Sequence, residues 1–457
     1  MIAEKFRNAL NQHPDRPFIV SSSGELTYAD FYQYSCQVAH QLDQLAPGRL
    51  ACHLPDSPEL VAVMLAAGLR GRSLVLFNHE YAPQQIEPLL QSVDVAVLIT
   101  DNPELSPPGC QVLGPEVLGQ VDHDYSENIA TQRDSDGEIL ILTSGTTGIS
   151  KCARYSWSGL FAQVSTKTAA ADERWLLAYH LNHFAGMMML FHVLSTCSTL
   201  VFAKSSKVAD SIRALGEHRV THVSSTPTFW RYALALLKNN RDQISLQHLT
   251  LGTEAVSADL LDNLHALFPD ARIVQVYGST EVGSVISVSD LKPGLPVSVL
   301  SRPESANVQF RIVDGELHVK SAIGMKGYLN ASRENSDAAN SQWLATGDLV
   351  RIEGDRIMFM GRKNETINCG GVKVHPLDVE NMITPLAGVK LVKAYGKDNA
   401  IVGQIVAVDV VCHENHDPEK VEAEIRQACS ALPTHSRPRS INIVDSMATN
   451  NFKLTRH

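Results

Sequence analysis

Thr143-Ser-Gly-Thr-Thr-Gly-Ile-Ser-Lys151 is the most informative stretch of this chain. It follows Glu138-Ile-Leu-Ile-Leu142, an apolar run of strand-forming residues that predicts a buried β-strand. The loop expected after this strand holds five hydroxyl residues, two glycines and one lysine. Glycines let backbone N–H groups converge on an anion, hydroxyls add donors, and Lys151 adds a positive charge. The stretch therefore predicts a phosphate-binding loop. It lacks the pattern G-x-x-x-x-G-K-[ST], and a polar surface turn is the alternative.

The composition is that of an ordinary globular protein. The chain has 457 residues, enough for two or three domains, with 44% hydrophobic and 19% charged residues. Its formal net charge of -10 argues against a broad basic face for nucleic acid. The eight cysteines form no C-x-x-C pair, which favours reduced thiols in the cytoplasm over disulfides or a zinc site. The first residues, Met1-Ile-Ala-Glu-Lys-Phe-Arg7, show no apolar signal core. We expect a cytoplasmic protein.

One segment raises the question of a membrane span. Residues 184–203 contain no charged side chain. The run Ser195-Thr-Cys-Ser-Thr199 interrupts their apolar character, whereas a spanning helix is more uniformly apolar. We expect a buried helix, a turn and a strand here, with no membrane span.

The first 286 residues alternate between helical and extended patterns, which predicts parallel strands joined by crossover helices. Strands are expected at 50–54, 73–77, 95–99, 138–142, 200–203, 220–224 and 273–277. Helices are expected at 59–69, 158–171, 207–217, 229–238 and 257–267. In open α/β sheets, ligands bind beyond the carboxyl ends of the strands, where the loops at 143–151 and 277–283 are expected.

The pattern changes after Ser287. A hairpin is expected around Asp314-Gly315, and a second one at 349–360. From about residue 362 the sequence predicts a small α+β unit. We therefore expect an α/β fold with a large N-terminal domain of mixed or parallel sheets at 1–361. It would include a β-rich subdomain at about 288–361, and a small, mobile α+β lid domain would occupy 362–457.

Further polar groups follow the expected strands and junctions. Tyr277-Gly-Ser-Thr-Glu281 combines an aromatic face that can stack on a base with a carboxylate that can bind Mg²⁺. Thr346-Gly-Asp348 offers a second carboxylate, suited to ribose hydroxyls, and Arg362 suits phosphate or ribose. Lys453 stands near the end of the chain, where a solvated tail is the ordinary interpretation.

Taken in order, these stretches resemble the AMP-forming adenylating superfamily of acyl- and aryl-CoA ligases, adenylation domains and beetle luciferases. Thr143–Lys151 resembles its phosphate loop T-S-G-[ST]-T-G-x-P-K, and Tyr277–Glu281 matches Y-G-x-T-E. Trp343–Leu349 is similar to W-x-x-T-G-D, and Gly361–Glu380 resembles the hinge and the glycine loop. Lys453 aligns with the C-terminal catalytic lysine. The resemblance covers nearly the whole chain and is closest to stand-alone acyl-CoA ligases.

The resemblance implies an ATP site and its residues. The ATP phosphates would be held by Thr143, Ser144, Gly145, Thr146, Thr147, Gly148 and Lys151. Adenine would lie between Tyr277-Gly278 and Gly252-Thr253-Glu254. These residues come from two separate stretches, one with Gly252, Thr253 and Glu254 and the other with Tyr277 and Gly278. Asp348 would bind the ribose hydroxyls, with Arg362 beside them.

The resemblance also implies the catalytic residues. Thr280 would contact the α-phosphate, and Glu281 would be the Mg²⁺ ligand. Lys453 would stabilise the carboxylate and α-phosphate oxygens as the adenylate forms. Gly370 and Gly371 belong to the loop that serves the thioester step with CoA.

Three departures from the family pattern stand at functional stretches. Ile149-Ser150 replaces the usual variable residue and proline of the phosphate loop. Asn364 stands at the hinge, where Asp or Lys is usual, so the domain rotation is an open question. Asn450-Asn451-Phe452 replaces the usual glycine before Lys453, which alters backbone freedom there.

The sequence indicates the acid substrate and the thiol acceptor only in part. Leu181-Asn-His183-Phe-Ala-Gly186 resembles F-H-x-x-G of CoA ligases, which makes His183 a candidate gate between the acid pocket and the thiol. The alternative is a structural histidine whose hydrogen bonds are satisfied within the core. No acidic residue occurs at 176–209, which disfavours an amino acid as substrate. The acid would be a small carboxylic acid, aryl or aliphatic.

The acceptor would be CoA or the phosphopantetheine thiol of a carrier protein. Two other classes of function remain at this point. One is a nucleotide-binding protein that no longer catalyses, and the other is a monooxygenase of luciferase type. Glu281 and Lys453 together favour an enzyme, because binding alone requires neither. We expect a ligase that uses ATP, Mg²⁺ and CoA, with no nucleic acid partner.

Overall fold

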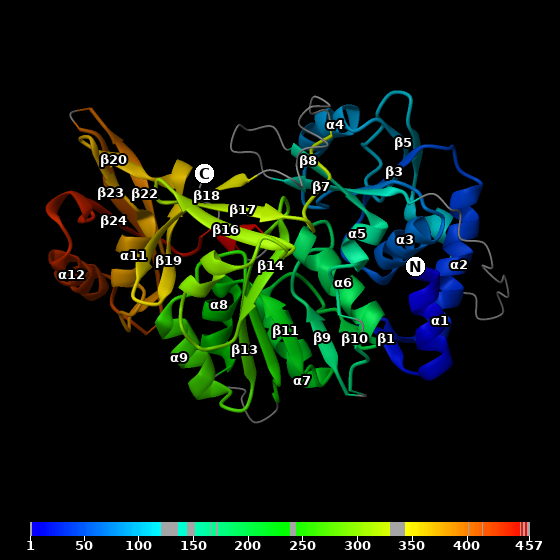
Figure 1. Cartoon of the computed structure of the whole chain (residues 1–457), viewed down its shortest axis with the longest axis horizontal. Helices are drawn as coiled ribbons and strands as arrows, with labels where there is room; N and C mark the ends of the chain where they lie inside the picture. The colour runs from blue at the N-terminus through cyan, green and yellow to red at the C-terminus, as the bar shows by residue number, and fades with distance from the viewer. Residues whose placement is uncertain are drawn as a thin grey trace.

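The computed structural model describes residues 2–119, 136–143, 151–165, 167–170, 172–237, 244–329, 343–400, 402–413, 415–447, 449–450 and 453–454. The chain forms a large lobe, which contains strands β1 to β19, and a small lobe, which contains β20 to β26 (Figure 1). The expected α/β fold with a β-rich part and a small C-terminal unit is confirmed. The domain boundary between residues 361 and 362 stays a prediction.

An eight-stranded sheet forms the centre of the large lobe, in the order β14-β13-β12-β11-β9-β10-β1-β2. In that order the strands are Gly283–Val288, Arg272–Ser279, His248–Gly252, His222–Ser225, Arg174–Leu177, Thr199–Val201, Pro17–Ser21 and Gly24–Thr27. Neighbouring strands from β13 to β1 are parallel, whereas β14 and β2 run antiparallel to their neighbours. The parallel strands therefore place their carboxyl ends along one edge.

A six-stranded sheet lies beside it, in the order β6-β5-β3-β4-β7-β8. In that order the strands are Gln111–Leu113, Val95–Thr100, Arg49–His53, Leu74–Leu76, Glu138–Thr143 and Lys151–Ser156. Only the β7–β8 pair of this sheet is antiparallel, with Thr143 opposite Lys151. The two ends of the predicted phosphate loop thus come from adjacent strands.

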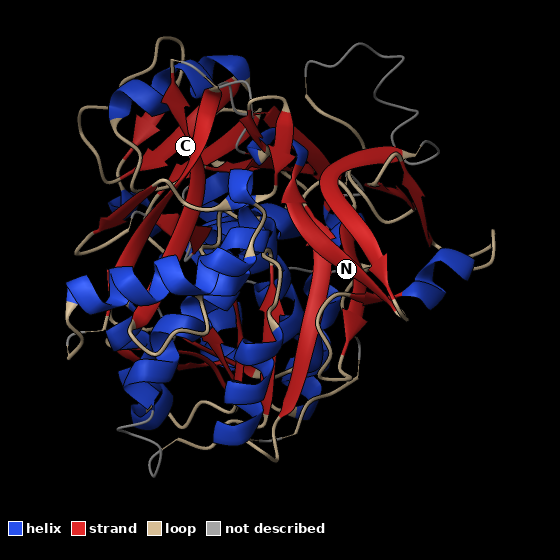
Figure 2. Ribbon diagram, turned by 90° about the vertical axis from the view of Figure 1, so that its left-hand side faces the viewer, coloured by secondary structure: helices blue, strands red, loops and turns tan. Residues whose placement is uncertain are grey.

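Helices fill the space between the two sheets and cover their outer faces (Figure 2). Five helices contribute to the largest core together with both sheets: α1 Ile2–Gln12, α2 Tyr28–Asp43, α3 Pro58–Leu69, α5 Trp157–Phe161 and α6 Phe184–Thr196. Three pack on the other face of the eight-stranded sheet: α7 Val208–Glu217, α8 Pro227–Leu237 and α9 Ala258–Leu267. Helix α4, Pro83–Ser92, packs against the six-stranded sheet.

Helix α6 explains the uncharged segment at 184–203. It is apolar around most of its circumference because it lies in the core between the sheets, and Leu190 and Phe191 are fully buried. The helix ends at Thr196, and strand β10 follows. In the part of the chain that the structure describes, no helix is long and apolar enough to cross a bilayer.

A five-stranded antiparallel sheet follows in the chain, in the order β15-β19-β18-β17-β16. In that order the strands are Leu295–Pro296, Arg356–Arg362, Leu344–Glu353, Glu316–Ser321 and Val308–Val313. Both predicted hairpins are present. Asp314 and Gly315 have φ values of 50° and 76°, the left-handed conformation that a two-residue hairpin turn requires.

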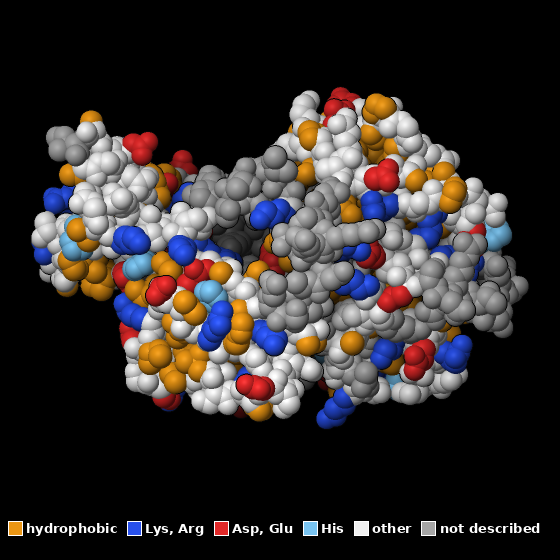
Figure 3. Space-filling model, turned by 45° about the horizontal axis from the view of Figure 1, so that its top comes forward, with side chains coloured by type: hydrophobic (Ala, Val, Ile, Leu, Met, Phe, Trp, Pro, Cys, Tyr) orange, Lys and Arg blue, Asp and Glu red, His pale blue; other side chains and the backbone are white. Residues whose placement is uncertain are grey.

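The small lobe has its own sheet and core. Its strands are β20 Ile367–Cys369, β21 Val372–Val374, β22 Val389–Asn399, β23 Gly403–Cys412 and β24 Ser440–Ile443, with the short pair β25 Thr449–Asn450 and β26 Lys453–Leu454. Helices α11, Pro376–Ile383, and α12, Pro418–Ala428, pack on the sheet. A recess separates the two lobes, and Lys or Arg side chains stand at its rim (Figure 3).

The two lobes touch through a few side chains. Tyr232 of α8 packs with Leu391 and Val411 of the small lobe, and its ring lies 5.3 Å below the Lys390 ammonium. A second contact is the ion pair that joins Arg351 Nη1 of β18 to Asp378 Oδ1 of α11, at 3.6 Å.

Some elements differ from those expected. The helix predicted at 158–171 ends at Phe161, because the following Val164-Ser-Thr-Lys-Thr168 is rich in residues that lose side-chain freedom or favour turns. The short strands β9, β12 and β14 were not predicted. Strand β12, His248-Leu-Thr-Leu-Gly252, carries half-exposed polar side chains on one face, which weakens the sequence signal of a central strand.

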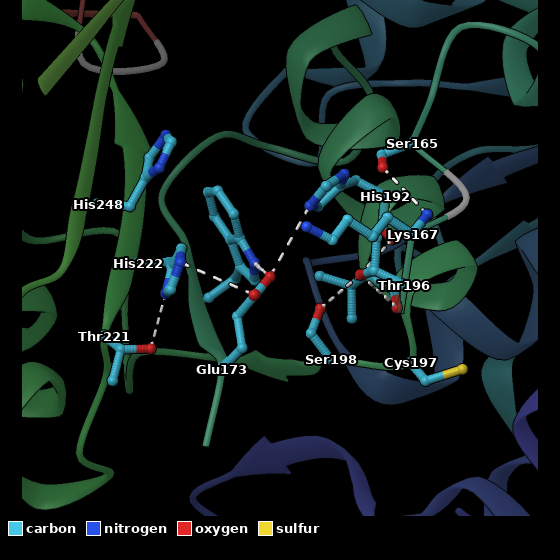
Figure 4. Close-up of polar contacts among 12 residues, drawn as sticks. Ser165, Lys167, Glu173, His192, Thr196, Cys197, Ser198, Thr221, His222 and His248 are labelled. Atoms are coloured by element: carbon cyan, nitrogen blue, oxygen red, sulfur yellow. Dashed lines mark hydrogen bonds and ion pairs between the residues drawn. The ribbon is translucent and has the colours of Figure 1, made fainter. Parts of the chain in front are cut away.

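That polar face of β11 and β12 carries a cluster of aromatic side chains at the amino ends of the strands. The Trp175 indole lies 5.2, 4.7 and 5.5 Å from the rings of His192, His222 and His248 (Figure 4). Its Nε1 donates to Glu173 at 2.8 Å, and the Glu173 oxygens lie 4.0 Å from His192 Nε2 and 3.9 Å from His222 Nε2. His222 and His248 stack at 5.5 Å. The cluster lies at the opposite end of these strands from their carboxyl ends.

This cluster predicts a stability that depends on pH. Burial, followed by the charge of neighbouring histidines, lowers the pKa of His222 and of His248 to about 4. The unfolded chain therefore binds more protons than the folded one as the pH falls from about 6.5 to 4. The free energy of unfolding should decrease through this window by a few kcal/mol, because one pH unit of displacement corresponds to about 1.4 kcal/mol.

Urea unfolding between pH 4 and 7 checks this expectation. The double variant His222→Gln/His248→Gln should lose less stability across the window than the unsubstituted chain. His265→Gln on the exposed face of α9 serves as the control and should keep the original slope. Equal slopes for all three proteins would contradict the assignment.

Candidate active site

Lys151 comes close to the adjacent residues Thr280 and Glu281, although it lies far from them in the sequence. The Tyr328 hydroxyl donates to Glu281 Oε1 at 3.0 Å, and the Lys151 ammonium lies 5.2 Å from the centre of the same Tyr328 ring. The Tyr155 hydroxyl donates to the Thr280 carbonyl at 2.8 Å. Two tyrosines that the sequence analysis did not single out therefore connect the β7–β8 end of one sheet to the β13–β14 turn of the other.

The segment around Tyr328 is fixed by its backbone. Lys326 N–H donates to Arg154 at 2.8 Å and Leu329 N–H to Cys152 at 2.8 Å, so the segment runs along strand β8. Met325 N–H donates to the Glu281 carbonyl at 3.0 Å. No local motif marks Tyr328, because its role arises from its hydrogen bond to Glu281, 47 positions away, and from its pairing with the still more distant strand β8. Burial and the Glu281 carboxylate raise the pKa of Tyr328.

The predicted phosphate loop is only partly within the described residues. Thr143 and Lys151 are paired across β7 and β8, and Thr143 Oγ1 donates to the Lys151 carbonyl at 3.3 Å. The predicted residues Ser144, Gly145, Thr146, Thr147 and Gly148 lie outside the described residues. Their roles stay predictions.

Tyr277, Asp348 and Arg362 form a connected group. The Tyr277 hydroxyl donates to Asp348 Oδ2 at 2.8 Å, and Arg362 Nε lies 3.1 Å from Asp348 Oδ1. One face of the Tyr277 ring stacks on Phe359, with ring centres 5.1 Å apart, so a base can use only the other face. Burial, followed by the neighbouring Asp348 carboxylate, raises the pKa of Tyr277 well above its ordinary value.

The strands themselves explain this arrangement. Asp348 and Arg362 stand opposite each other in β18 and β19, and Gly347 has a φ of 75° that turns the backbone before Asp348. Gly347 N–H donates to Glu316 at 2.9 Å, and Lys363 Nζ binds the same carboxylate at 2.8 Å. Glu316 was not predicted from the sequence. It holds the turns on both sides of the Asp348–Arg362 pair.

Gly252 ends strand β12 beside Val276 of β13, and Thr253 and Glu254 follow the strand. Gly252 is paired with Val276, next to Tyr277, and the role of these residues in adenine binding stays a prediction. The Glu254 carboxylate accepts from the Thr228 N–H at 3.0 Å and from its hydroxyl at 3.1 Å, at the start of α8. Strand β13 continues through Ser279, so Gly278 lies within it and the turn is only residues 280–282.

His183 is the residue that precedes α6, and the adjacent Phe184 ring lies 5.6 Å from Tyr155. His183 is thus connected to Thr280 through its chain neighbour Phe184, the Phe184–Tyr155 ring contact and the Tyr155 hydrogen bond to the Thr280 carbonyl. Burial, followed by the proximity of His180, lowers the pKa of His183 to about 4, so this imidazole is neutral at pH 7. Its role as a gate stays a prediction.

The two segments of the small lobe that were predicted to act in the reaction lie apart. Gly370 and Gly371 form the two-residue turn between β20 and β21, with φ values of 62° and 87°. Their turn is exposed at the far end of the small lobe (Figure 1). Strand β26, whose backbone begins at Lys453, lies beside helix α8 of the large lobe. This pose brings the Lys453 strand, and not the glycine turn, to the large lobe.

The residues present fit a nucleotide and its metal ion. Asp348, Arg362 and the free face of Tyr277 suit a nucleoside, and Lys151 suits phosphate. Among the described side chains, no group of three or more His, Cys, Asp or Glu is arranged to hold a metal ion. A lone carboxylate such as Glu281 is nevertheless the usual kind of Mg²⁺ ligand when phosphates supply the others.

Comparison with known proteins agrees with this geometry. The sequence pattern of the AMP-binding enzyme family matches residues 6–329. The chain therefore belongs to the AMP-binding enzyme family. A 2-succinylbenzoate–CoA ligase of Bacillus pumilus is 27% identical over 470 residues, which cover 97% of this chain and 94% of that protein.

Two solved structures share the fold. The o-succinylbenzoate CoA synthetase of Bacillus subtilis, in complex with its acyl-adenylate intermediate, has a TM-score of 0.78 at 23% identity, covering 98% of this chain and 96% of that one. A benzoate CoA ligase of Burkholderia xenovorans LB400 has a TM-score of 0.84 at 20% identity, covering 99% and 98%.

Proposed function

We propose that this chain is an AMP-forming acid–thiol ligase. It activates a small carboxylic acid with ATP to an acyl-AMP, releases pyrophosphate, and transfers the acyl group to the thiol of CoA. Membership of the AMP-binding enzyme family supports the nucleotide chemistry. The observation that carries the proposal is the paired set Tyr277–Asp348–Arg362 beside Lys151–Tyr328–Glu281.

Each group has a place in the first half-reaction. A carboxylate oxygen of the acid forms a bond to the α-phosphorus, and the bond from that phosphorus to the oxygen of pyrophosphate breaks. Tyr277, Asp348 and Arg362 hold the nucleoside, while Lys151 and the hydroxyls of the phosphate loop hold the phosphates. Thr280 contacts the α-phosphate, and Lys453 neutralises the charge that develops there. Mg²⁺ bound at Glu281 would neutralise phosphate charge.

In the second half-reaction the thiol sulfur bonds to the acyl carbon, and AMP leaves. The turn of Gly370 and Gly371 would serve this step, which requires a different pose of the small lobe. His183 would separate the acid from the thiol. All eight cysteines are unpaired, which supports the proposed cytoplasmic location.

Pyrophosphate release tests the proposal. A panel of acids is assayed with ATP, beginning with 2-succinylbenzoate and benzoate, the acids named for the relatives, and continuing with straight-chain fatty acids. We expect release that depends on the acid, and a thioester only when CoA is added. A thioester formed only on a phosphopantetheinyl carrier protein would favour the carrier as acceptor. ATP binding without release for any acid would favour a non-catalytic nucleotide-binding protein.

Glu281→Gln should raise the Mg²⁺ requirement of acyl-AMP formation. The substitution keeps the size of the side chain and an acceptor for the Tyr328 hydroxyl, but it removes the charge. Loss of even an outer partner of a metal site costs about 10–100-fold in metal affinity, so the half-saturating Mg²⁺ concentration should rise at least about tenfold. Mg²⁺ titration of pyrophosphate release measures it.

Glu138→Gln is the matched control for this experiment. Glu138 is paired with Arg154 at 2.7 Å, at the start of β7 and thus at the other end of the strand that leads to the phosphate loop. We expect its Mg²⁺ titration to match that of the unsubstituted chain. If Glu281→Gln also matches, Glu281 has a structural and not a metal-binding role.

A further inference from the structure

The Asp56 carboxylate ties the two sheets of the large lobe together at the candidate site. Asp56 lies between β3 and α3, beyond the carboxyl end of a strand of the six-stranded sheet. Its Oδ2 lies 2.5 Å from His180 Nδ1, and its Oδ1 accepts from the Leu181 N–H at 2.9 Å. Both partners belong to the turn that follows β9 of the eight-stranded sheet. The pair is only partly exposed, with 23% and 19% of the Asp56 and His180 side chains accessible.

The same turn carries His183. The His183 N–H donates to the His180 carbonyl at 3.1 Å, and the His183 carbonyl accepts from Met187 at 3.1 Å in the first turn of α6. A Cβ atom on Gly186 would lie only 2.1 Å from the His180 carbonyl oxygen, so the helix packs directly on this turn. The turn is therefore held from two sides, by the helix and by Asp56.

His183 depends on the turn for its orientation. Its Nε2 atom is buried and has no hydrogen-bond partner among the described residues. A ring without a bond at this atom keeps the direction that its backbone and its packing give it. The backbone direction is set by the contacts of His180 and Leu181 with Asp56.

The charges around the turn are consistent with an ionic anchor. Burial lowers the pKa of His180, but its bond to Asp56 and the charges of Asp56 and Glu80 outweigh burial, so the pKa of His180 is raised from its ordinary value. The protonated form of His180 thus pairs with Asp56, while His183 stays neutral.

We propose that Asp56 is a positioning residue, which fixes the 180–184 turn through His180 and Leu181 and thereby directs His183 at the reacting acyl group. In this role Asp56 acts through the turn and not by contact with the substrate. This inference rests on the proposed function, because it assumes that an acid is activated beside Thr280. It assigns a role to a carboxylate that belongs to none of the family motifs in this sequence.

A double-mutant cycle tests whether Asp56 acts through His183. The acid from the panel with the highest kcat/KM is the probe, and pyrophosphate release and thioester formation are both measured. Misplacement of a site residue by about 1 Å can cost about 100-fold, so Asp56→Ala should lower kcat/KM for the acid by about 10- to 100-fold. The KM for ATP should stay unchanged. His183→Ala should show the same loss, and the double variant should lose no more than His183→Ala alone.

Asp56→Asn and a control variant distinguish loss of the Asp56 charge from loss of the folded structure. The amide oxygen of Asn can still accept from Leu181, so we expect Asp56→Asn to fold and to lose less activity than Asp56→Ala. The control is Asp101→Asn, which breaks an exposed carboxylate–histidine pair, His79–Asp101 at 3.0 Å, near the same edge of the six-stranded sheet. It should keep full activity. NMR titration of the imidazole rings should show the pKa of His180 falling in Asp56→Asn and unchanged in Asp101→Asn.

Three outcomes overturn the inference. The first is full activity of Asp56→Ala, and the second is additive losses in the double variant. The third is a KM for ATP that rises in Asp56→Ala by the same factor by which kcat/KM for the acid falls. Each is read against the unsubstituted chain. If that chain itself releases no pyrophosphate with any acid, the proposed function fails, and the NMR result then decides the Asp56–His180 contact alone.

Discussion

Lys453→Ala is expected to lower the rate of acyl-AMP formation by about 10²–10³-fold, the usual cost of one lost preorganised charge contact in such a site. Thioester formation from supplied acyl-AMP should remain largely intact. The reason is that the ammonium group is needed only while pyrophosphate leaves. The position of β26 beside α8 is compatible with this role, because it brings the backbone of Lys453 to the large lobe.

The two half-reactions are measured separately, by pyrophosphate release and by CoA consumption with synthetic acyl-AMP. Lys420→Ala is the matched control, since Lys420 lies exposed on α12 of the same lobe. It should change neither half-reaction. An equal fall of both half-reactions in Lys453→Ala would show that the assigned role is wrong.

Asn364→Pro is expected to leave acyl-AMP formation near normal and to reduce thioester output strongly. Asn364 lies in the short 3₁₀ turn Lys363–Glu365 at the junction of the lobes. Backbone φ values in such turns lie near −50° to −70°, which a proline ring adopts, so the variant fits the present pose. Proline also disfavours the helical conformation of the preceding Lys363, so the turn is strained even though the φ of residue 364 is fixed. A junction fixed in this pose cannot bring the glycine turn to the site.

Asn364→Ala distinguishes the effect of a rigid backbone at residue 364 from the effect of losing the asparagine side chain. It keeps the N–H group and ordinary backbone freedom, so we expect both half-reactions to proceed. The same two assays apply, after the folded state of each variant is checked by its thermal midpoint. Equal losses in both half-reactions of Asn364→Pro, or no loss in either, would rule out rotation at this position.

Much of the site was predictable because its residues stand in motifs. The hydroxyl, aromatic and charged residues of the stretches at 277–281 and 346–348 keep their spacing in sequence, and the structure brings Tyr277, Asp348 and Arg362 into direct contact. The hairpin at Asp314-Gly315 was predictable for the same reason, since the turn requires those residue types.

The residues that support the site were not predictable. Tyr328, Glu316 and Asp56 act through partners 47, 47 and 124 positions away, and none stands in a recognisable pattern. Their roles follow from which strands are neighbours, and single-sequence periodicity does not reveal the order of strands in a sheet. The short strand β9, Arg174–Leu177, was missed because four residues are too few to show the alternation of a strand. The low pKa of His183 likewise depends on burial, which follows only from the tertiary packing.

The contacts between the two lobes contribute to the free-energy difference between the poses of the small lobe. The Arg351–Asp378 pair is half-exposed, and such pairs contribute about 0–1 kcal/mol. The Lys390 ammonium over the half-buried Tyr232 ring contributes about 0.5–2 kcal/mol, and the apolar packing of Tyr232 with Leu391 and Val411 adds to it. An equilibrium between poses that rests on a small set of such contacts responds to a ligand whose affinity for the two poses differs by a few kcal/mol. Exchange of ATP for the adenylate product can therefore change which pose is populated without any part of the large lobe being remodelled.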